Sequence, residues 1–310
     1  MRDRTMPLLA AALVALLVLG VVLPQWVNTL TIAVSWGVVV LGMMLMMRTG
    51  LVSFGQGLYY CLGGYSAAVL HKFYGIGDIL VMVVAGTVVA AAVAAVLGLL
   101  MAKYRDIFFA MLSLAFSMIL FGLLVKSQQL GSTDGFGLGV RSIAGVVLPQ
   151  GHERFVVFAA SGVIALVLAL GMHRYLSSHL GRLAGAIKDN ELRVEYMGES
   201  VRKVIHLNYV ISAALAGVGG ALAAITVGHV DPEMSYWTQS GEFVFITILS
   251  GTGSVLAPFL GAIIFETVRS FAYEYSHNTG QMVLGITMLL VIMFLPGGLW
   301  SVFIRPRKEA

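Results

Sequence analysis

Charged residues are scarce in this sequence. Only 11% of its 310 residues are Asp, Glu, Lys or Arg, whereas 59% are hydrophobic. An ordinary soluble domain has roughly a quarter charged residues, and a soluble fold with so few charges would leave its surface largely apolar. The composition therefore excludes an ordinary soluble protein. It indicates an all-α polytopic membrane protein in which residues 1–310 form one domain.

Cysteine is nearly absent, and the common catalytic motifs are missing. Cys61 is the single cysteine, so the chain can form no internal disulfide, and no Cys/His spacing typical of a zinc site occurs. The sequence contains neither a Walker A motif for ATP nor an H-E-x-x-H motif. A net charge of +4 is not a nucleic-acid signal. We therefore expect no catalytic residue, metal, cofactor or nucleic-acid partner in this chain.

Apolar runs long enough to cross a bilayer recur along the chain, since a spanning helix needs about 20 mainly apolar residues. They predict about eight to ten membrane helices, counting a broken pair described below. The first run, from Pro7 to Leu23, is expected to remain as a span, with a cleaved signal peptide as the alternative. The predicted spans are 7–25, 28–47, 51–71, 78–101, 107–126, 155–174, 204–227 and 281–303, with a long apolar region at 242–272.

The distribution of Lys and Arg predicts the orientation. With the N-terminus in the cytoplasm, most basic residues fall on the cytoplasmic side, as the positive-inside rule requires, and the C-terminal "RPRK" lies there too. This N-in, C-in topology makes 127–153 a periplasmic loop and 175–203 a cytoplasmic loop. It also requires the region 242–272 to begin and end outside, so that region cannot be a single crossing.

The middle of that region contains residues that break helices. They are Gly251, Gly253, Ser254 and Pro258. We expect two helices, about 242–250 and 255–270, joined by a turn. They are either two short re-entrant halves or a tilted hairpin that reaches the inside, and one kinked helix is the remaining alternative.

Two further features concern the spans. Small residues recur every four positions in "ISAALAGVGGALAA" (211–224), which predicts close helix packing, within the subunit or against a partner. Charge within the membrane is rare but present at Glu242, Glu266 and Arg269, where it has either a structural or a transport role.

Charge is concentrated in the segment "GRLAGAIKDNELRVEYMGES" (181–200). Leu180, Leu183, Ala184 and Ile187 fall on one face of a predicted helix, while acids and bases alternate elsewhere. Positive-inside bias explains the bases but not the acids. The pattern therefore predicts short amphipathic helices whose apolar stripe lies in a groove of a partner protein.

This segment resembles the cytoplasmic loop of permease subunits of branched-chain amino acid ABC transporters, in particular the LivM type, with its G-R-x-x-x-A-I-[RK]-[DE]-N-E pattern. "TGLVSFGQGLYYCLGGYSAAVL", "LSLAFSMIL" with "GSTDGFGL", "LSGTGSVLAPFLGAII" and "FLPGGLW" resemble other segments of the same family, in the same order. The resemblance implies a transport subunit of the bacterial inner membrane rather than an enzyme. Its implied partners are a second, LivH-like permease, LivG- and LivF-like ATPases that hold ATP and Mg, and a periplasmic solute-binding protein.

The resemblance also implies site residues. Contact with the ATPases is expected at Gly181, Arg182, Ala186, Ile187, Lys188, Asp189, Asn190, Glu191 and Gly198. The substrate path is expected at Ser53, Gln56, Gly57, Tyr60, Phe116 and Ser117, where Ser53, Gln56 and Tyr60 would share one helix face; the alternative is that these groups only hold helices together.

The expected solute depends on positions where this sequence departs from the family pattern. Gln56, Ser117 and Met118 depart from the family pattern on the expected path, and Thr252 and Ala257 replace glycine in the broken region. Branched-chain or other hydrophobic amino acids are the first expectation, and urea, amides or aromatic and other organic acids are the alternatives. A secondary transporter or channel, and a membrane enzyme or scaffold, remain as rival classes.

Overall fold

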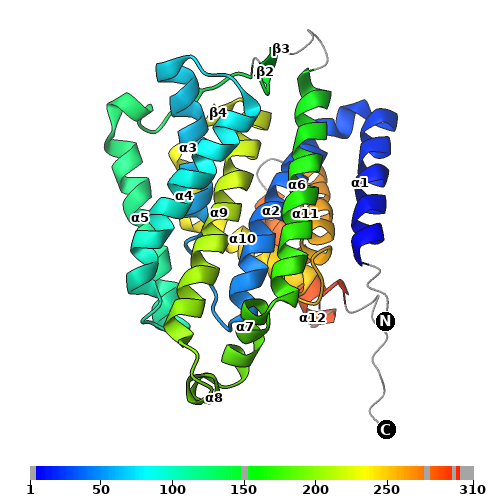
Figure 1. Ribbon diagram of the computed structural model, residues 1–310. Helices are drawn as coiled ribbons and strands as arrows, with labels where there is room; N and C mark the ends of the chain where they lie inside the picture. Colours follow the sequence, from blue (N-terminus) through cyan, green and yellow to red (C-terminus); the bar gives the residue numbers. More distant parts are fainter. Residues whose placement is uncertain (1–4, 141, 148–152, 276–279, 295–297, 301–310) are drawn as a thin grey trace.

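The computed structural model describes residues 5–140, 142–147, 153–275, 280–294 and 298–300. Its helices pack side by side into one bundle (Figure 1). The helices are α1 (Thr5–Val22), α2 (Val27–Arg48), α3 (Gln56–Tyr74), α4 (Ile79–Met101), α5 (Asp106–Lys126), α6 (Glu153–Ser177), α7 (His179–Asp189), α8 (Glu191–Tyr196), α9 (Val201–Val227), α10 (Trp237–Ser250), α11 (Ala257–Tyr275) and α12 (Gly280–Phe294).

Short elements lie in the connections. Single-turn 3₁₀ helices occupy Pro24–Trp26 (η1), Gln128–Leu130 (η2) and Pro232–Ser235 (η3). The strands β1 (Phe136–Gly137) and β4 (His229–Val230) pair antiparallel, as do β2 (Ser142–Ile143) and β3 (Val146–Val147). The strands lie at one end of the bundle, called here the strand end, and α7 and α8 lie at the opposite end, called here the α7–α8 end (Figure 1).

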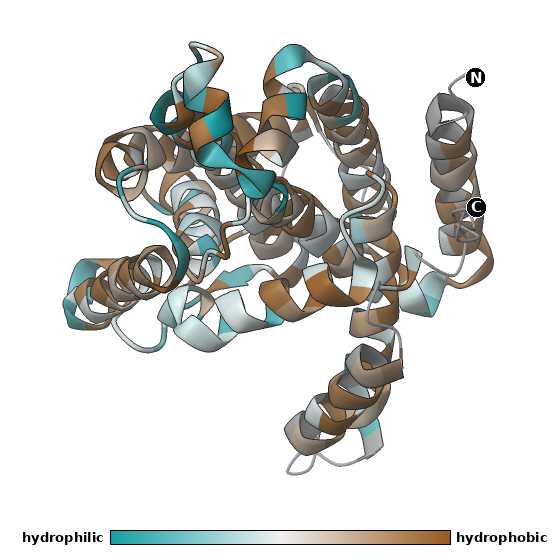
Figure 2. Cartoon of the chain, turned by 90° about the horizontal axis from the view of Figure 1, so that it is seen from below, coloured by the Kyte–Doolittle hydropathy of each residue, from teal (hydrophilic) through white to brown (hydrophobic). Residues whose placement is uncertain are grey.

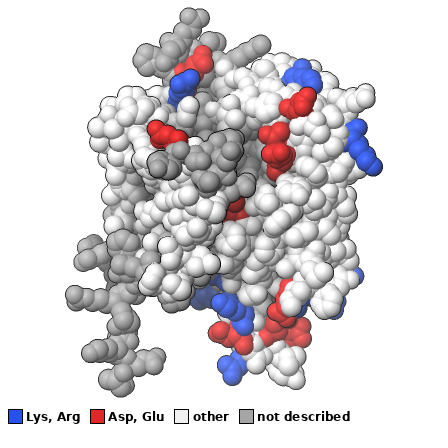
Figure 3. Space-filling model, turned by 180° about the vertical axis from the view of Figure 1, so that it is seen from behind, with Lys and Arg blue, Asp and Glu red and all other residues white. Residues whose placement is uncertain are grey.

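The bundle is polytopic, as predicted. Among the described residues, five helices are long and apolar enough to cross a membrane: Pro24–Arg48, Ile79–Met101, Asp106–Lys126, Glu153–Ser177 and Val201–Val227. In Figure 3 the acidic and basic side chains gather at the two ends of the visible face and leave the band between them mostly uncharged. Such a band is what a hydrocarbon layer requires.

The predicted span 51–71 is wrong at its start. Residues 51–55 are not helical, and α3 begins only at Gln56. The Ser53 hydroxyl accepts a hydrogen bond from the Gly55 N–H, and the Phe54 N–H donates to the Ser113 hydroxyl of α5. These bonds hold a non-helical segment inside the bundle, where freed backbone groups are tolerated because protein covers them.

The central helix of the bundle is α9, and its small residues let three neighbours come close. A Cβ at Gly217 would lie 2.6 Å from Ala90 of α4, and one at Gly219 would lie 2.6 Å from the Ser35 carbonyl oxygen of α2. At Gly220 the nearest atom would be the carbonyl oxygen of Tyr60 in α3, only 1.8 Å away. The predicted close packing therefore occurs within this subunit.

The region 242–272 contains two helices, as predicted, and their arrangement is a hairpin. After α10, Gly251 adopts a φ of +80°, which favours glycine, and the non-helical turn runs to residue 256. Thr252 in this turn contacts Arg48, the last residue of α2. At the far end of α11, the Phe271 ring lies 5.4 Å from the ring of Trp26, just before α2 begins. The hairpin thus reaches the α7–α8 end and returns, and one kinked helix is excluded.

Asp78 links the strand end to α4. Its carboxylate caps the helix by accepting from the N–H groups of Leu80 and Val81, and it also accepts from the N–H of Gly145 and the hydroxyl of Ser142. Burial by itself would raise the pKa of Asp78, but these hydrogen bonds outweigh it and hold that pKa below its ordinary value. The ionised form is therefore the one that stabilises the fold.

We expect Asp78→Ala to lower the free energy of unfolding by about 1–2 kcal/mol at pH 7, the effect of losing a helix cap. Because the folded pKa is depressed, the stabilisation is present above the unfolded pKa and is lost as pH falls through the folded one. Thermal unfolding in detergent at pH 7 and pH 3 should show a difference between parent and variant that shrinks at pH 3. Asp134→Ala, at an exposed carboxylate of the same end, is the control; an equal loss there would contradict the assignment.

Candidate functional site

A cavity of about 260 Å³ lies on the strand side of the hairpin. Helices α2, α3, α9, α10 and α11 and the β4–η3 segment all contribute to its wall. The lining residues are Ile32, Trp36, Tyr60, Ala223, Ala224, Val227, His229, Asp231, Glu233, Met234, Gln239, Glu266 and Arg269. Charged and apolar side chains therefore share one partly open cavity in a bundle whose buried side chains are mostly apolar.

Arg269 is the basic residue in the charged wall of the cavity. One of its terminal nitrogens, Nη1, lies 3.5 Å from a carboxylate oxygen of Glu266 and 4.0 Å from one of Glu242. The face of the guanidinium lies over the Trp36 ring, 4.8 Å from its centroid. Because a guanidinium has five N–H donors, these contacts leave donors that can bind an anionic group in the cavity.

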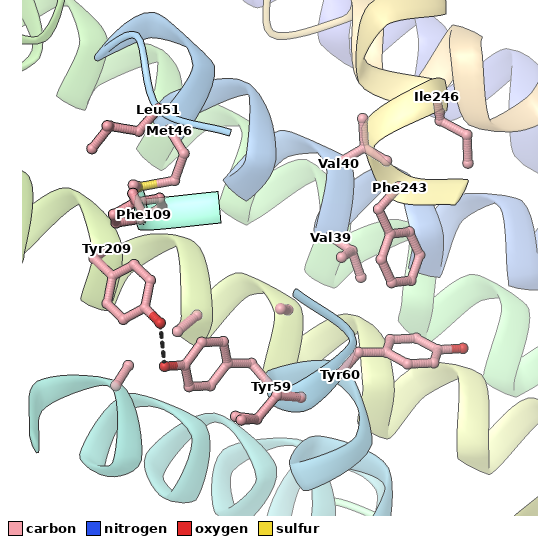
Figure 4. Close-up of a cluster of buried hydrophobic side chains, with 14 of the residues drawn as sticks. Val39, Val40, Met46, Leu51, Tyr59, Tyr60, Phe109, Tyr209, Phe243 and Ile246 are labelled. Carbon is pink, nitrogen blue, oxygen red and sulfur yellow. Dashed lines mark hydrogen bonds between the residues drawn. The ribbon is translucent and has the colours of Figure 1, made fainter. Parts of the chain in front are cut away.

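The apolar wall is held in place by aromatic packing. The Trp36 Nε1–H donates to the Tyr60 hydroxyl over 3.2 Å, and both rings stack edge-on against Phe243 of α10, with centroids 5.3 and 5.2 Å away. Figure 4 shows Tyr60 beside Phe243, with Val39 and Val40 of α2 nearby. Interlocked rings of this kind fix the shape of the wall before any solute enters.

Acidic residues follow β4 on the way into the cavity. Asp231 and Glu233 flank Pro232 in the segment that leads from β4 through η3. β4 is fixed by its pairing with β1 and by the contact of the His229 ring with the Asp134 carbonyl oxygen, 3.0 Å away. One oxygen of the Asp231 carboxylate is buried without a hydrogen-bond partner. Asp231 and Glu233 therefore line the same cavity as Arg269 and Glu266.

Tyr60 is the predicted path residue that lines this cavity; the other five do not line it. Gln56 donates to the Ser212 hydroxyl, the Gly57 N–H to the Ser240 hydroxyl, and the Ser117 hydroxyl to the Ser235 carbonyl oxygen. Ser53 lies before α3, so the expected common face of Ser53, Gln56 and Tyr60 does not exist. Phe116 packs against the hydrophobic core. The hydrogen bonds of Gln56, Gly57 and Ser117 fasten α3 and α5 to α9, η3 and α10.

The predicted apolar stripe of α7 faces its own chain. Leu183, Ala184 and Ile187 are buried, with Ile187 only 2% exposed, whereas Leu180 is 37% exposed. Leu183 and Ile187 belong to the same core as Met46 of α2, and Ala186 packs against it. The expectation that this stripe lies in a partner's groove is therefore wrong. The reason is that the ends of α2 and α9 offer an apolar surface within the same chain.

Structural roles also account for several other loop residues. A Cβ at Gly181 would lie 2.2 Å from the Tyr175 carbonyl oxygen of α6, so glycine is needed in the first turn of α7. Asn190 caps α8, and Glu191 forms an ion pair of 2.6 Å with Arg105 at the start of α5. Gly198 takes a φ of +87° just after α8. Arg182, Lys188 and Asp189 are exposed.

A different apolar surface is exposed at this end, and the sequence analysis did not identify it. Leu192, Tyr196 and Met197 of α8 and its C-cap are 64%, 88% and 60% exposed. Leu192 and Tyr196 are four residues apart and share one face of α8, and Met197 follows at its C-cap. Figure 2 views the bundle from this end and shows hydrophilic and hydrophobic stretches side by side there. We call these three residues the α8 knob.

The described part of the chain contains no group of three or more His, Cys, Asp or Glu side chains able to hold a metal ion. The charged wall of the cavity can instead bind a small solute through its charges. The Glu266–Arg269 pair was visible in the sequence as an i, i+3 spacing. Asp231 and Trp36 were not, because their approach depends on how β4 and α2 pack.

The family model and the related proteins that match this chain are all described as branched-chain amino acid transport permeases. The family model described as "Branched-chain amino acid transport system / permease component" matches residues 25–292. The chain is 28% identical to the high-affinity branched-chain amino acid transport system permease protein LivM of Escherichia coli K12, over 93% of this chain and 74% of that protein. It is 24% identical to BraD of Pseudomonas aeruginosa and 26% identical to LivH of E. coli K12, each over 93% of this chain and 97% of the relative.

Proposed function

The chain belongs to the family of branched-chain amino acid transport permease components, and we propose that it forms half of the translocation path of an ATP-driven importer in a bacterial inner membrane. The other half would be a second permease, since both LivM and LivH are similar to this chain. ATP and Mg would bind to separate cytoplasmic ATPases, and a periplasmic binding protein would deliver the solute. The chain itself would catalyse no reaction.

Sidedness in this proposal follows from charge. Arg174, Arg182, Lys188, Arg193 and Arg202 cluster around α7 and α8, and the positive-inside rule assigns such an end to the cytoplasm. The strand end, with the cavity beneath it, is then periplasmic. A solute released by a binding protein at the strand end would meet the cavity first.

The cavity is the observation that carries the proposal, because its chemistry suits an amino acid. Arg269 offers free guanidinium donors to a carboxylate, Glu266 and Asp231 offer oxygens to an ammonium group, and Ile32 and Val227 line the space for an aliphatic side chain. A volume of about 260 Å³ accepts a small solute. Urea and amides lack the charges that these groups would neutralise, and organic acids would use only Arg269. Branched-chain or other hydrophobic amino acids therefore fit best.

The decisive experiment is uptake of radiolabelled L-leucine by proteoliposomes that contain this chain with its permease, ATPase and binding-protein partners. We expect uptake that requires internal ATP and stops with vanadate. Uptake that persists without ATP and collapses when ion gradients are dissipated would instead identify a secondary transporter. Replacing leucine by urea or benzoate tests the alternative solutes, and preferred uptake of either would overturn the proposed substrate.

The α8 knob is the best candidate for contact with the ATPases, since the α7 stripe is buried within the chain. Exposed aromatic and aliphatic side chains on a short helix, surrounded by charges, are typical anchors for a groove on another protein. The ion pair between Glu191 and Arg105 ties the base of α8 to α5. A push on the knob would therefore be transmitted to the bundle.

We expect Tyr196→Ala to reduce co-purification of the ATPases about tenfold or more, because truncating an interface anchor typically costs about 2 kcal/mol. The melting temperature of the permease should not change, since Tyr196 is 88% exposed. Tyr74→Ala is the matched control, a tyrosine 71% exposed at the strand end. Unchanged co-purification of Tyr196→Ala, or an equal loss for Tyr74→Ala, would contradict docking at the α8 knob.

A further inference from the structure

Arg48 joins two segments that are far apart in the sequence. It is the last residue of α2, and its Nε–H and Nη2–H both donate to the Thr252 carbonyl oxygen, over 3.0 and 2.5 Å. Thr252 lies in the turn of the α10–α11 hairpin. The C-termini of α2 and α10 therefore meet at this guanidinium, whose positive charge suits the negative ends of both helices.

The hairpin turn is held from a second side as well. The Leu299 N–H donates to the Leu249 carbonyl oxygen over 2.7 Å, and a Cβ at Gly298 would lie 2.6 Å from the Gly251 nitrogen. The turn is thus clasped between α2 and the segment 298–300. On the α2 side, Arg48 makes the contact that holds the turn.

The end of α2 also touches α7. Gly50, two residues after Arg48, has a φ of +80°, and a Cβ there would lie 3.3 Å from Cγ of Lys188. Leu51 and Ile187 share the same hydrophobic core. Residues 48–51 therefore contact α7 on one side and the hairpin turn on the other.

The hairpin in turn carries the charged wall of the cavity. Glu242 lies on α10, and Glu266 and Arg269 lie on α11. Near the turn the two helices are in close contact, because a Cβ at Gly261 would lie 2.7 Å from the Ser250 Cβ. A displacement of the turn would therefore move both helices together and shift the three charged groups relative to Trp36 on α2.

We propose that Arg48 is a positioning residue that transmits movement of α7 and α8 to the α10–α11 hairpin and so to the cavity. The inference rests on the proposed function, since the movement would come from the ATPases. Arg48 acts through the Thr252 main-chain carbonyl and touches neither solute nor ATP. Its two donors on one carbonyl resist tilting of the turn in a way that a single ammonium does not.

The test compares Arg48→Gln with two controls in the reconstituted importer. Thr252→Ala keeps the carbonyl that Arg48 uses, and Arg202→Gln removes an exposed charge from the same end. We expect Arg48→Gln to retain at least half of the ATP hydrolysis but to import at least tenfold less leucine per ATP. Arg48→Lys should give an intermediate ratio, and both controls should match the parent.

A second measurement distinguishes a loss of transmitted movement at the cavity from a loss of stability in the Arg48→Gln protein. Val227→Cys places a thiol in the cavity wall, and the native Cys61 is fully buried. In the parent, vanadate trapping should change the rate of maleimide labelling at position 227 at least threefold, and Arg48→Gln should abolish this change. If Arg48→Gln imports leucine at the parental ratio, or loses import and hydrolysis together with assembly, the role of Arg48 is refuted. A parent that shows no ATP-driven uptake would overturn the proposed function as well.

Discussion

Arg269→Gln is expected to reduce leucine uptake about 30-fold or more. Arg269 lies in the cavity wall and forms ion pairs with Glu266 and Glu242, and in the proposed function its remaining donors would bind the solute carboxylate. Removing one partner from a buried charge pair typically costs about 2–5 kcal/mol, which corresponds to roughly 30-fold to several thousand-fold in affinity. Initial rates of radiolabelled leucine uptake in proteoliposomes measure the effect.

The single substitution also leaves two carboxylates without their base, so a loss of folding must be separated from a loss of solute binding. The double variant Arg269→Gln with Glu266→Gln keeps the net charge of the three-residue cluster at its original value. We expect it to recover the parental melting temperature in detergent while uptake stays low. Recovery of uptake in the double variant would mean that the cluster only supports the fold, and the cavity would no longer be a solute site.

Local features of the sequence predicted most of the architecture. A backbone in hydrocarbon must satisfy its own hydrogen bonds, so each apolar run becomes a helix almost independently of its neighbours. This is why 78–101 and 107–126 were placed within a residue of α4 and α5. The α10–α11 hairpin followed from the glycines at 251 and 253, which are a local feature, together with a count of the crossings along the whole chain.

Features set by packing between distant elements were not predictable in the same way. The inward-turning segment 51–55 looks as apolar as a helix, and its conformation depends on Ser113 of α5. The α7 stripe showed that an apolar face would be buried, but not against which surface. The cavity needs Trp36, Asp231 and Arg269 from three elements, and no spacing in the sequence relates them.

The packing of α9 leads to the second large expected effect. Gly220→Ala should lower the free energy of unfolding by about 3 kcal/mol or more, because overpacking of this severity forces the backbones of α3 and α9 apart. The added Cβ would lie 1.8 Å from the Tyr60 carbonyl oxygen, which belongs to rigid backbone and has no flexible side chain to yield. For a chain of 310 residues such a loss lowers the melting temperature by about 5 °C.

The matched control is Gly171→Ala in α6, where an added Cβ would meet nothing within 4 Å. Alanine favours a helix interior over glycine by about 0.5–1 kcal/mol, so this variant should melt at the parental temperature or slightly above it. Fluorescence-detected melting of both variants in detergent, with the amount of protein in the membrane fraction, measures the contrast. Because Tyr60 lines the cavity and Gly220 packs against its backbone, the loss at Gly220 should extend to uptake. A Gly220→Ala protein that melts and transports like the parent would show that α3 and α9 are not in the close contact described.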